Sequence, residues 1–274
     1  MIFGRKIHLR SIAALIFAAL IFASCATTKE IGEIEKIKQN GTIFIGTTGD
    51  YRPLSFKEKS GEYWGFGIEL AEKIAFRLGA KPQFVQTSWK TLSADVLEEP
   101  QKFDFAIGGI TITDERKKTM LMSDGYLANG KTILCRREDA QKFNSLEDID
   151  KSEIRVMVNP GGLNEKFAKA NLKNAQILIH EQNEEIPNLI AEGKADIMIT
   201  EITEAPYYVA TDERLASPLL ENPFTHGEIG VLAKKSKSAL VDFINKTIAE
   251  MKKSGELKTL CEKYSLVYVY DSKE

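Results

Sequence analysis

Residues 159–167 read Asn-Pro-Gly-Gly-Leu-Asn-Glu-Lys-Phe, and this stretch decides the fold. It follows an apolar run over Ile154–Val158, typical of a buried strand, and it opens a helical pattern over Glu165–Leu172. A strand that turns through two glycines into a helix leaves unpaired backbone N–H groups, which favour an anion together with the helix dipole. The Lys-Ser/Thr ending of a phosphate-binding loop is missing. The stretch therefore predicts a carboxylate-binding turn, with an ordinary turn that binds nothing as the alternative.

A second anion-binding residue is Arg116, the last residue of the stretch Gly109–Arg116. This stretch follows another apolar strand pattern, over Phe103–Ile107. A guanidinium is always charged and can bind a carboxylate through two parallel hydrogen bonds. Two anion-binding features, each after a strand and in different halves of the chain, predict a ligand held between two lobes.

Strand and helix patterns alternate along the chain, which is typical of α/β folds with parallel sheets and helices on their faces. Such sheets bind ligands beyond the carboxyl ends of their strands. The helical patterns include Ile68–Leu78, which Gly79 ends, and a core-facing stripe in Ser238–Lys253. The predicted strands are Thr42–Gly46, Pro82–Gln86, Phe103–Ile107, Ile154–Val158, Gln176–Ile179 and Asp196–Ile199, with crossover strands near Thr132–Arg136 and Glu228–Ala233.

The first 24 residues predict a secretory signal, because basic residues precede an apolar run, Ile12–Phe22, that is too short for a good membrane span. The sequence Phe22-Ala23-Ser24-Cys25 resembles a bacterial lipobox. We therefore expect an exported, periplasmic or cell-surface protein, with lipid on Cys25 and a tether over residues 25–33. Ordinary cleavage with a free Cys25 is the alternative.

Composition excludes several classes of function. The chain has a formal net charge of −2 at pH 7, and removing the basic signal makes it more acidic, which argues against a nucleic-acid partner. Neither the cysteines nor the histidines have metal-site spacing, so we expect no metal and no cofactor. Cys135 and Cys261 could form one disulfide, but two buried free thiols are the preferred interpretation.

The region from about Ile34 to Tyr264 resembles the family 3 bacterial solute-binding proteins. The resemblance is carried by Gly65–Ala71, Phe103–Ala106 and Ile110–Arg116, which includes Thr111. It implies an α/β, two-lobed periplasmic-binding-protein fold of type II, in which each lobe is a mainly parallel sheet flanked by helices and the ligand lies in the cleft. We expect lobe 1 to comprise residues 34–131 and 228–274, and lobe 2 to comprise residues 132–227.

Several stretches are similar to the cyclohexadienyl dehydratases, enzymes on the same fold. These are Gly46–Pro53, Thr87–Trp89, Asn129–Thr132, Asn159–Leu172, Gly193–Asp196 and Thr200–Ala205. The resemblance implies a carbon–oxygen lyase that converts prephenate or arogenate to phenylpyruvate or phenylalanine. The alternative is an amino-acid-binding lipoprotein that serves an ABC permease, so the expected partner is a small carboxylate or an amino acid.

Loss of hydroxide and carbon dioxide from a cyclohexadiene gains aromaticity, so the reaction needs little beyond one proton donor. A carboxylic acid kept neutral by burial can supply that proton. The resemblance implies that Glu204 is this acid and that Arg116 binds a substrate carboxylate. The other implied substrate-binding residues are Asp50, Tyr51, Trp89, Thr111, Lys131, Asn159, Gly162, Leu163 and Glu201.

Three positions in the second lobe depart from the dehydratase pattern. Leu163 stands where a threonine hydroxyl helps to hold a carboxylate, and it offers only its backbone N–H. Glu201 replaces an aspartate that meets the α-amino group in amino-acid binders, and Pro187 replaces an aromatic residue. The departures bear on the substrate more than on the fold.

Overall fold

The structure is a computed structural model that describes residues 32–270. The predicted signal, Cys25 as the predicted site of lipidation, and most of the predicted tether lie outside the described residues. No helix within residues 32–270 combines the length and apolarity that crossing a membrane requires.

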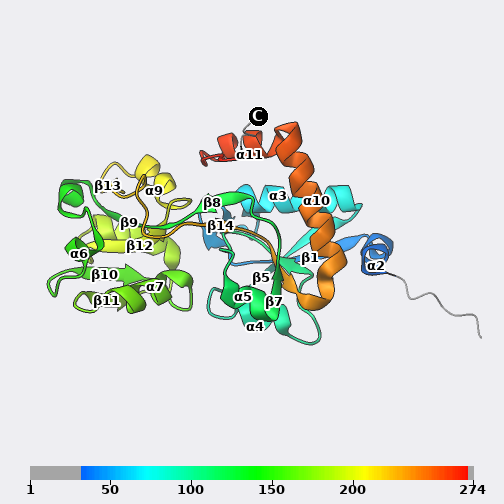
Figure 1. Ribbon diagram of the computed structural model, residues 1–274, viewed down its shortest axis with the longest axis horizontal. Helices are drawn as coiled ribbons and strands as arrows, with labels where there is room; N and C mark the ends of the chain where they lie inside the picture. The colour runs from blue at the N-terminus through cyan, green and yellow to red at the C-terminus, as the bar shows by residue number, and fades with distance from the viewer. Residues whose placement is uncertain (1–31, 271–274) are drawn as a thin grey trace, which may run out of the picture. The chain divides into compact units, whose positions relative to one another are not determined.

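The first of two five-stranded sheets has the strand order β5-β1-β6-β15-β7 (Figure 1). Its first three strands are parallel, whereas β15 pairs antiparallel with both β6 and β7. The strands are β1 (Thr42–Thr47), β5 (Lys81–Gln86), β6 (Phe105–Ala106), β7 (Met120–Met122) and β15 (Leu232–Lys234). The helices of this part are α2 (Glu33–Asn40), α3 (Phe66–Leu78), α4 (Leu92–Leu97), α5 (Asp114–Thr119), α10 (Ser238–Ser254) and α11 (Glu256–Lys263).

The second sheet repeats this plan with the order β11-β10-β12-β9-β13. Again three strands are parallel and the last two are antiparallel. The strands are β9 (Lys131–Arg136), β10 (Arg155–Val158), β11 (Gln176–Ile179), β12 (Ile197–Glu201) and β13 (Leu215–Ala216). The helices are α6 (Leu146–Ile149), α7 (Leu163–Asn171), α8 (Ile186–Ala191) and α9 (Ala205–Thr211), together with the 3-10 turns η2 (Arg137–Lys142) and η3 (Asn183–Glu185).

The predicted α/β fold class is confirmed, but each sheet is mixed rather than mainly parallel. Two strands, β8 (Leu127–Asn129) and β14 (Gly227–Ile229), pair antiparallel and connect the two sheets. The predicted crossover strands near Thr132–Arg136 and Glu228–Ala233 adjoin this pair, since β9 belongs to the second sheet and β15 to the first. The exact lobe boundaries at 131/132 and 227/228 stay a prediction.

A further small sheet follows β1, formed by β2 (Asp50–Tyr51), β3 (Ser55–Lys57) and β4 (Tyr63–Trp64).

Alternating side chains of the second sheet pack into two different clusters. Met157 and Met198 belong to one apolar cluster, and their chain neighbours Val156 and Ile197 belong to the other. Successive side chains of a strand point to opposite faces, so both faces of this sheet are buried. Cys135 packs in one of these clusters and Cys261 in the core of the first sheet, and both are free thiols, as predicted.

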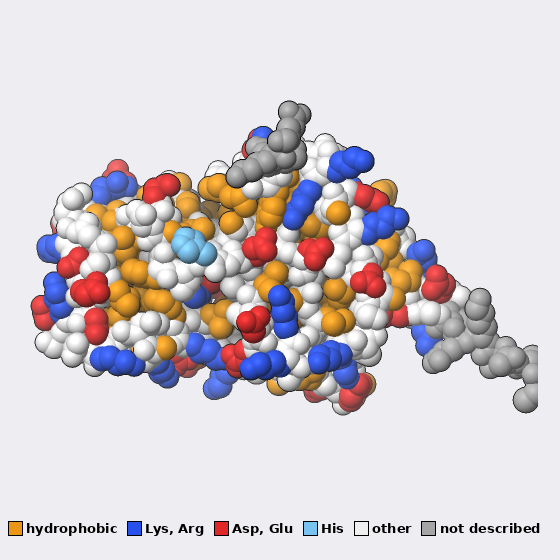
Figure 2. All heavy atoms as spheres, viewed as in Figure 1, with side chains coloured by type: hydrophobic (Ala, Val, Ile, Leu, Met, Phe, Trp, Pro, Cys, Tyr) orange, Lys and Arg blue, Asp and Glu red, His pale blue; other side chains and the backbone are white. Residues whose placement is uncertain are grey.

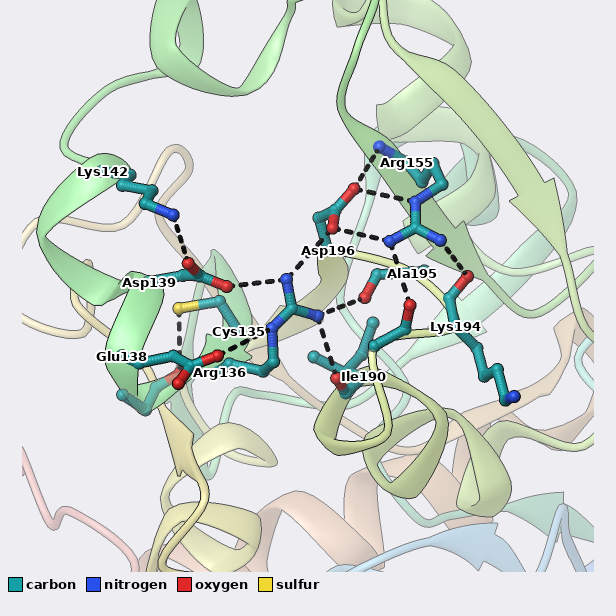
Figure 3. Close-up of polar contacts among 12 residues, drawn as sticks. Cys135, Arg136, Glu138, Asp139, Lys142, Arg155, Ile190, Lys194, Ala195 and Asp196 are labelled. Atoms are coloured by element: carbon teal, nitrogen blue, oxygen red, sulfur yellow. Dashed lines mark hydrogen bonds and ion pairs between the residues drawn. The ribbon is translucent and has the colours of Figure 1, made fainter.

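An ionic cluster fixes the amino ends of β10 and β12 (Figure 3). The Asp196 carboxylate accepts hydrogen bonds from the backbone N, Nε and Nη2 of Arg155 at 3.0, 3.0 and 2.9 Å. It also accepts one from Arg136 Nη2 at 3.1 Å, and Arg136 in turn pairs with Asp139. This cluster lies at the edge of the sheet opposite the carboxyl ends of β10 and β12.

Candidate functional site

A small cavity lies at the carboxyl ends of the parallel strands and is lined by residues from both halves of the chain. Its volume is about 20 Å³, which holds one water molecule. The lining residues are Tyr51, Trp89, Gly109, Thr111, Arg116, Lys131, Asn159, Gly162, Leu163, Asn164 and Glu201. The structure thus brings together all the residues predicted for the site except Asp50 and Glu204, which lie behind the lining.

Arg116 is the cation that the first half of the chain contributes. It follows Thr113, the N-cap of α5, whose Oγ1 accepts a hydrogen bond from Arg116 N at 3.2 Å. The guanidinium donates from Nη1 to the Thr111 carbonyl oxygen at 2.5 Å. Among residues 32–270, no carboxylate forms an ion pair with it. Burial lowers the pKa of Arg116, so an anion beside it would be favourable.

Lys131 and Glu201 form an ion pair inside the site. They are direct partners in the antiparallel pairing of β9 and β12, so their side chains emerge on the same face. Lys131 Nζ lies 2.5 Å from Glu201 Oε1 and 2.6 Å from Asn164 Oδ1. The two charged side chains are only 8% and 6% exposed.

Glu201 has further donors around it. The Tyr51 hydroxyl donates to its Oε2, and Thr111 Oγ1 donates to Oε1 at 3.2 Å. Burial opposes ionisation of Glu201, but the charge and hydrogen bond of Lys131 outweigh it and lower the pKa of Glu201. The carboxylate is therefore ionised, with its charge balanced within the protein.

Strand β10 turns through Gly161 and Gly162 into a helix as predicted, although α7 begins at Leu163 rather than Glu165 and the Gly161 N–H already donates to Glu165 Oε2 at 2.7 Å. Gly162 is the N-cap residue of α7. Because glycine has no side chain, it cannot accept a hydrogen bond from the first N–H groups of this helix. Gly161 has a φ of 81°, and a Cβ there would meet Lys90 Cα at 2.5 Å. Glycine is thus required where this turn approaches the segment after β5.

Two aromatic rings form one wall of the cavity. Tyr51 and Trp89 pack edge to face, with ring centroids 5.5 Å apart. Trp89 Nε1 donates to Asp50 Oδ1 at 3.0 Å, so Asp50 orients the indole from behind the lining. Burial raises the pKa of Asp50.

Glu204 lies behind the cavity lining and is fully buried. Its Oε2 lies 2.5 Å from Thr200 Oγ1, and its Oε1 accepts from Asn183 Nδ2 at 2.8 Å. The pKa of Glu204 is raised to about 8, mainly by burial. The nearby carboxylates of Glu201 and Asp50 raise it further, whereas the hydrogen bonds from Thr200 and Asn183 lower it. Glu204 is therefore protonated at neutral pH.

Two polar residues of the site were missed by sequence reasoning. Asn164 Oδ1 accepts a hydrogen bond from Lys131 Nζ. Asn183 Nδ2 donates both to Glu204 Oε1 and to the Asp50 carbonyl oxygen, the second at 3.1 Å. Asn164 lies within the quoted turn, at the second position of α7. Asn183 follows β11, and the carboxyl end of a parallel strand was the signal that could have found it. Within residues 32–270 no cluster of His, Cys, Asp or Glu is arranged to hold a metal ion.

Comparison with known proteins places these features in context. The sequence profile of the bacterial extracellular solute-binding proteins, family 3, matches residues 43–267. The cyclohexadienyl dehydratase of Pseudomonas aeruginosa is 36% identical over 92% of both chains. The L-cystine-binding protein TcyJ of Escherichia coli is 26% identical over 95% of both. The crystal structure of the ancestral amino acid-binding protein AncCDT-1, a precursor of cyclohexadienyl dehydratase, has a TM-score of 0.78 and 36% identity, over 85% of this chain and 99% of that one.

Proposed function

The chain belongs to the family 3 bacterial extracellular solute-binding proteins, and on this basis we propose that it is a cyclohexadienyl dehydratase. The observation that carries the proposal is Glu204, a fully buried carboxyl group whose pKa is raised by burial to about 8 and which lies behind the lining of a cavity that contains Arg116. A dehydratase needs a donor that protonates the leaving hydroxyl, and a carboxyl group kept neutral by burial can be that donor.

The reaction follows from this arrangement. The ring carboxylate leaves as carbon dioxide, and the electron pair of the broken C–C bond enters the ring. The C–O bond on the opposite side of the ring breaks, and the departing hydroxide takes the proton of Glu204 and leaves as water. The ring becomes aromatic, and Glu204 regains a proton from solvent before the next turnover. A positioned general acid contributes about 10²–10⁴-fold to the rate of such a step.

The charges of the site favour prephenate over amino-acid ligands. Arg116 is available to the carboxylate of the side chain. Glu201 would be the partner of an α-ammonium group, but Lys131, Tyr51 and Thr111 already donate to it. A carboxylate ligand without an α-ammonium group therefore fits better than arogenate or an amino acid.

The cavity must widen before it admits this substrate. Its volume of about 20 Å³ is far below the range of roughly 300–1,000 Å³ of small-molecule sites. Within residues 32–270 the chain passes between the two sheets through the short strands β8 and β14, so we expect the lobes to separate and close again around the ligand. In the ligand-bound state, Glu204 must reach the leaving hydroxyl from its place behind the lining.

The second candidate function is delivery of an amino acid to an ABC permease. Its support is that many relatives are binding proteins, including TcyJ, and that AncCDT-1 is named an amino acid-binding protein. Export and a lipid anchor on Cys25 stay part of the proposal under either function, since the family is extracellular.

The deciding experiment uses the chain without its signal, residues 26–274, incubated with prephenate while phenylpyruvate is followed by absorbance. Turnover that exceeds the spontaneous reaction supports the enzyme. Absence of turnover, together with calorimetric binding of cystine, glutamine, arginine or lysine, would establish the binding protein instead.

A further inference from the structure

A second cavity lies directly outside the first and has a volume of about 310 Å³. We call it the outer cavity. It shares three lining residues with the inner cavity, Trp89, Arg116 and Leu163, so the two cavities are neighbours. Its other lining residues are Ser93, Thr113, Glu115, Lys118, Thr119, Met120, Gly161 and Lys166.

The outer cavity is positively charged. Its lining has three cationic residues, Arg116, Lys118 and Lys166, against one carboxylate, Glu115. Lys166 Nζ pairs with Glu115 Oε2 at 3.2 Å, which joins α7 to α5. Within the described part of the chain, neither Arg116 nor Lys118 has an ion-pair partner. Figure 2 shows Lys and Arg side chains gathered along the lower edge of the view, near α5 and α7.

The lining has an apolar side as well. Trp89, Met120 and Leu163 offer an indole, a thioether and an isobutyl group, and Ser93 and Thr119 add hydroxyls. A space of about 310 Å³ with an apolar wall and two unpaired cations has the properties of a site for a small ligand. The positive charge of the outer cavity favours an anionic ligand, and its apolar wall favours a ligand with a ring or an alkyl group.

We propose that the outer cavity is a separate binding site for small organic carboxylates, with the carboxylate between Arg116 and Lys118 and the apolar body against Trp89 and Met120. Because Arg116 lines both cavities, a carboxylate bound here can pass to the inner cavity without losing its cation. The site would capture anionic ligands before the inner cavity widens. This inference does not require that the protein is an enzyme.

The test uses benzoate as the probe and the ε-methyl NMR resonance of Met120 as the reporter, because Met120 lines only the outer cavity. We expect a saturable shift of this resonance, while the methyl group of Met157, in the core of the second sheet, stays in place. An unmoved Met120 resonance at saturating benzoate would overturn the proposal.

Three variants sharpen the test. Ser93→Trp fills the outer cavity from an exposed position on α4 and should abolish the Met120 shift. Lys118→Gln should weaken benzoate binding about two- to fivefold, and Glu115→Gln, which removes the only carboxylate of the lining, should tighten it about as much. If Ser93→Trp does not fold, the opposite shifts of the two charge variants decide. Equal affinities in all variants would show that benzoate binds elsewhere.

Discussion

Lys131 Nζ lies 2.5 Å from Glu201 Oε1 because the two residues are direct partners in the antiparallel ladder of β9 and β12. The pair is buried, and Glu201 accepts further hydrogen bonds from Tyr51 and Thr111. The chain therefore contains, as part of its own fold, the cation that an amino-acid ligand would otherwise bring to this carboxylate.

The first prediction concerns this pair. Lys131→Met leaves Glu201 buried without its counter-ion, and breaking a buried ion pair on one side costs about 3–5 kcal/mol. We expect the free energy of unfolding in urea to fall by that order. The variant should also gain affinity for amino acids, since an α-ammonium can replace the lost cation. Calorimetry with arginine tests this gain, and Lys173→Met, an exposed lysine outside the site, is the control. Unchanged stability would show that the pair contributes nothing.

The second prediction concerns Arg116. Its guanidinium forms no direct ion pair in the described part of the chain, where Glu201 and Glu115 act on it only at longer range, so a ligand carboxylate would be its direct anionic partner. Truncating one member of a buried charged pair costs about 2–5 kcal/mol, so Arg116→Ala should weaken ligand binding at least about tenfold. Isothermal titration with whichever ligand binds measures this. The exposed neighbour Lys117→Ala is the matched control, and equal affinities would remove Arg116 from the site.

Sequence reasoning succeeded where a residue's role depends on its position along one strand or helix. The turn at Asn159–Gly162, the strands before it and the helix cap at Gly79 are local features, set by periodicity and by glycine conformation. The resemblance to the dehydratases named Tyr51, Trp89 and Glu201 as site residues, and the carboxyl-end rule indicated that strand ends such as those before Tyr51 and Arg116 meet at one site.

It failed where the answer depends on register between distant strands. The pairing of Lys131 with Glu201 requires β9 to lie beside β12, and the pattern over Thr132–Arg136 predicts a strand but not its neighbour. For the same reason Asn183 escaped notice, because its contact with Glu204 joins two separate strand ends. Whether a carboxyl group points into a cavity or lies behind its wall, as Glu204 does, is likewise a matter of packing.

The third prediction concerns Leu163. This side chain lies at the first position of α7 and lines both cavities. Leu163→Thr adds a hydroxyl that can donate to a substrate carboxylate, and it removes some apolar contact. We expect the fold to stay intact. If the protein is a dehydratase, the variant should keep or raise its prephenate turnover. Leu163→Val, which shortens the side chain without a hydroxyl, separates the two effects. A loss of turnover in the threonine variant alone would contradict this view.

The fourth prediction concerns acid stability. Partial burial opposes ionisation of Asp196, but hydrogen bonds from Arg155 and Arg136 lower its pKa from 3.8 to about 2. A carboxyl group whose pKa falls on folding stabilises the protein above its unfolded pKa, and this stabilisation is lost as the pH falls from about 5 to 2. Asp196→Asn should therefore lower the free energy of unfolding at pH 7 by on the order of 1–2 kcal/mol, allowing for solvent screening.

Urea unfolding of Asp196→Asn and the wild type at pH 7 and pH 3 checks this, and the difference between them should shrink at pH 3. Asp212→Asn is the control, because Asp212 pairs with the exposed Arg214 at the surface and should contribute less. A difference that stays constant with pH would mean that ionisation of Asp196 is not its cause.

The last prediction concerns Glu204 and the chemistry. Burial raises the pKa of Glu204 to about 8, so the group holds its proton at neutral pH and loses it above. Prephenate turnover should be constant below this value and fall as the pH rises through about 8. Glu204→Gln keeps the shape but has no acidic proton, and it should lower turnover by about 10²–10⁴-fold while substrate still binds. Steady-state rates between pH 5 and 10, for both proteins, test this.

The raised pKa of Glu204 can also be tested without a substrate, through the pH dependence of stability. The folded protein retains a proton on Glu204 between the unfolded pKa of 4.5 and the folded value of about 8, whereas the unfolded chain releases it. Stability must then fall with rising pH across this window, and Glu204→Gln should remove this part of the fall. Glu181→Gln, the same change at an exposed position two residues before the turn η3, is the matched control. If the stabilities of the wild type and of Glu204→Gln decline equally steeply with pH, Glu204 is already ionised in the folded state. The proposed acid would then have to be another group.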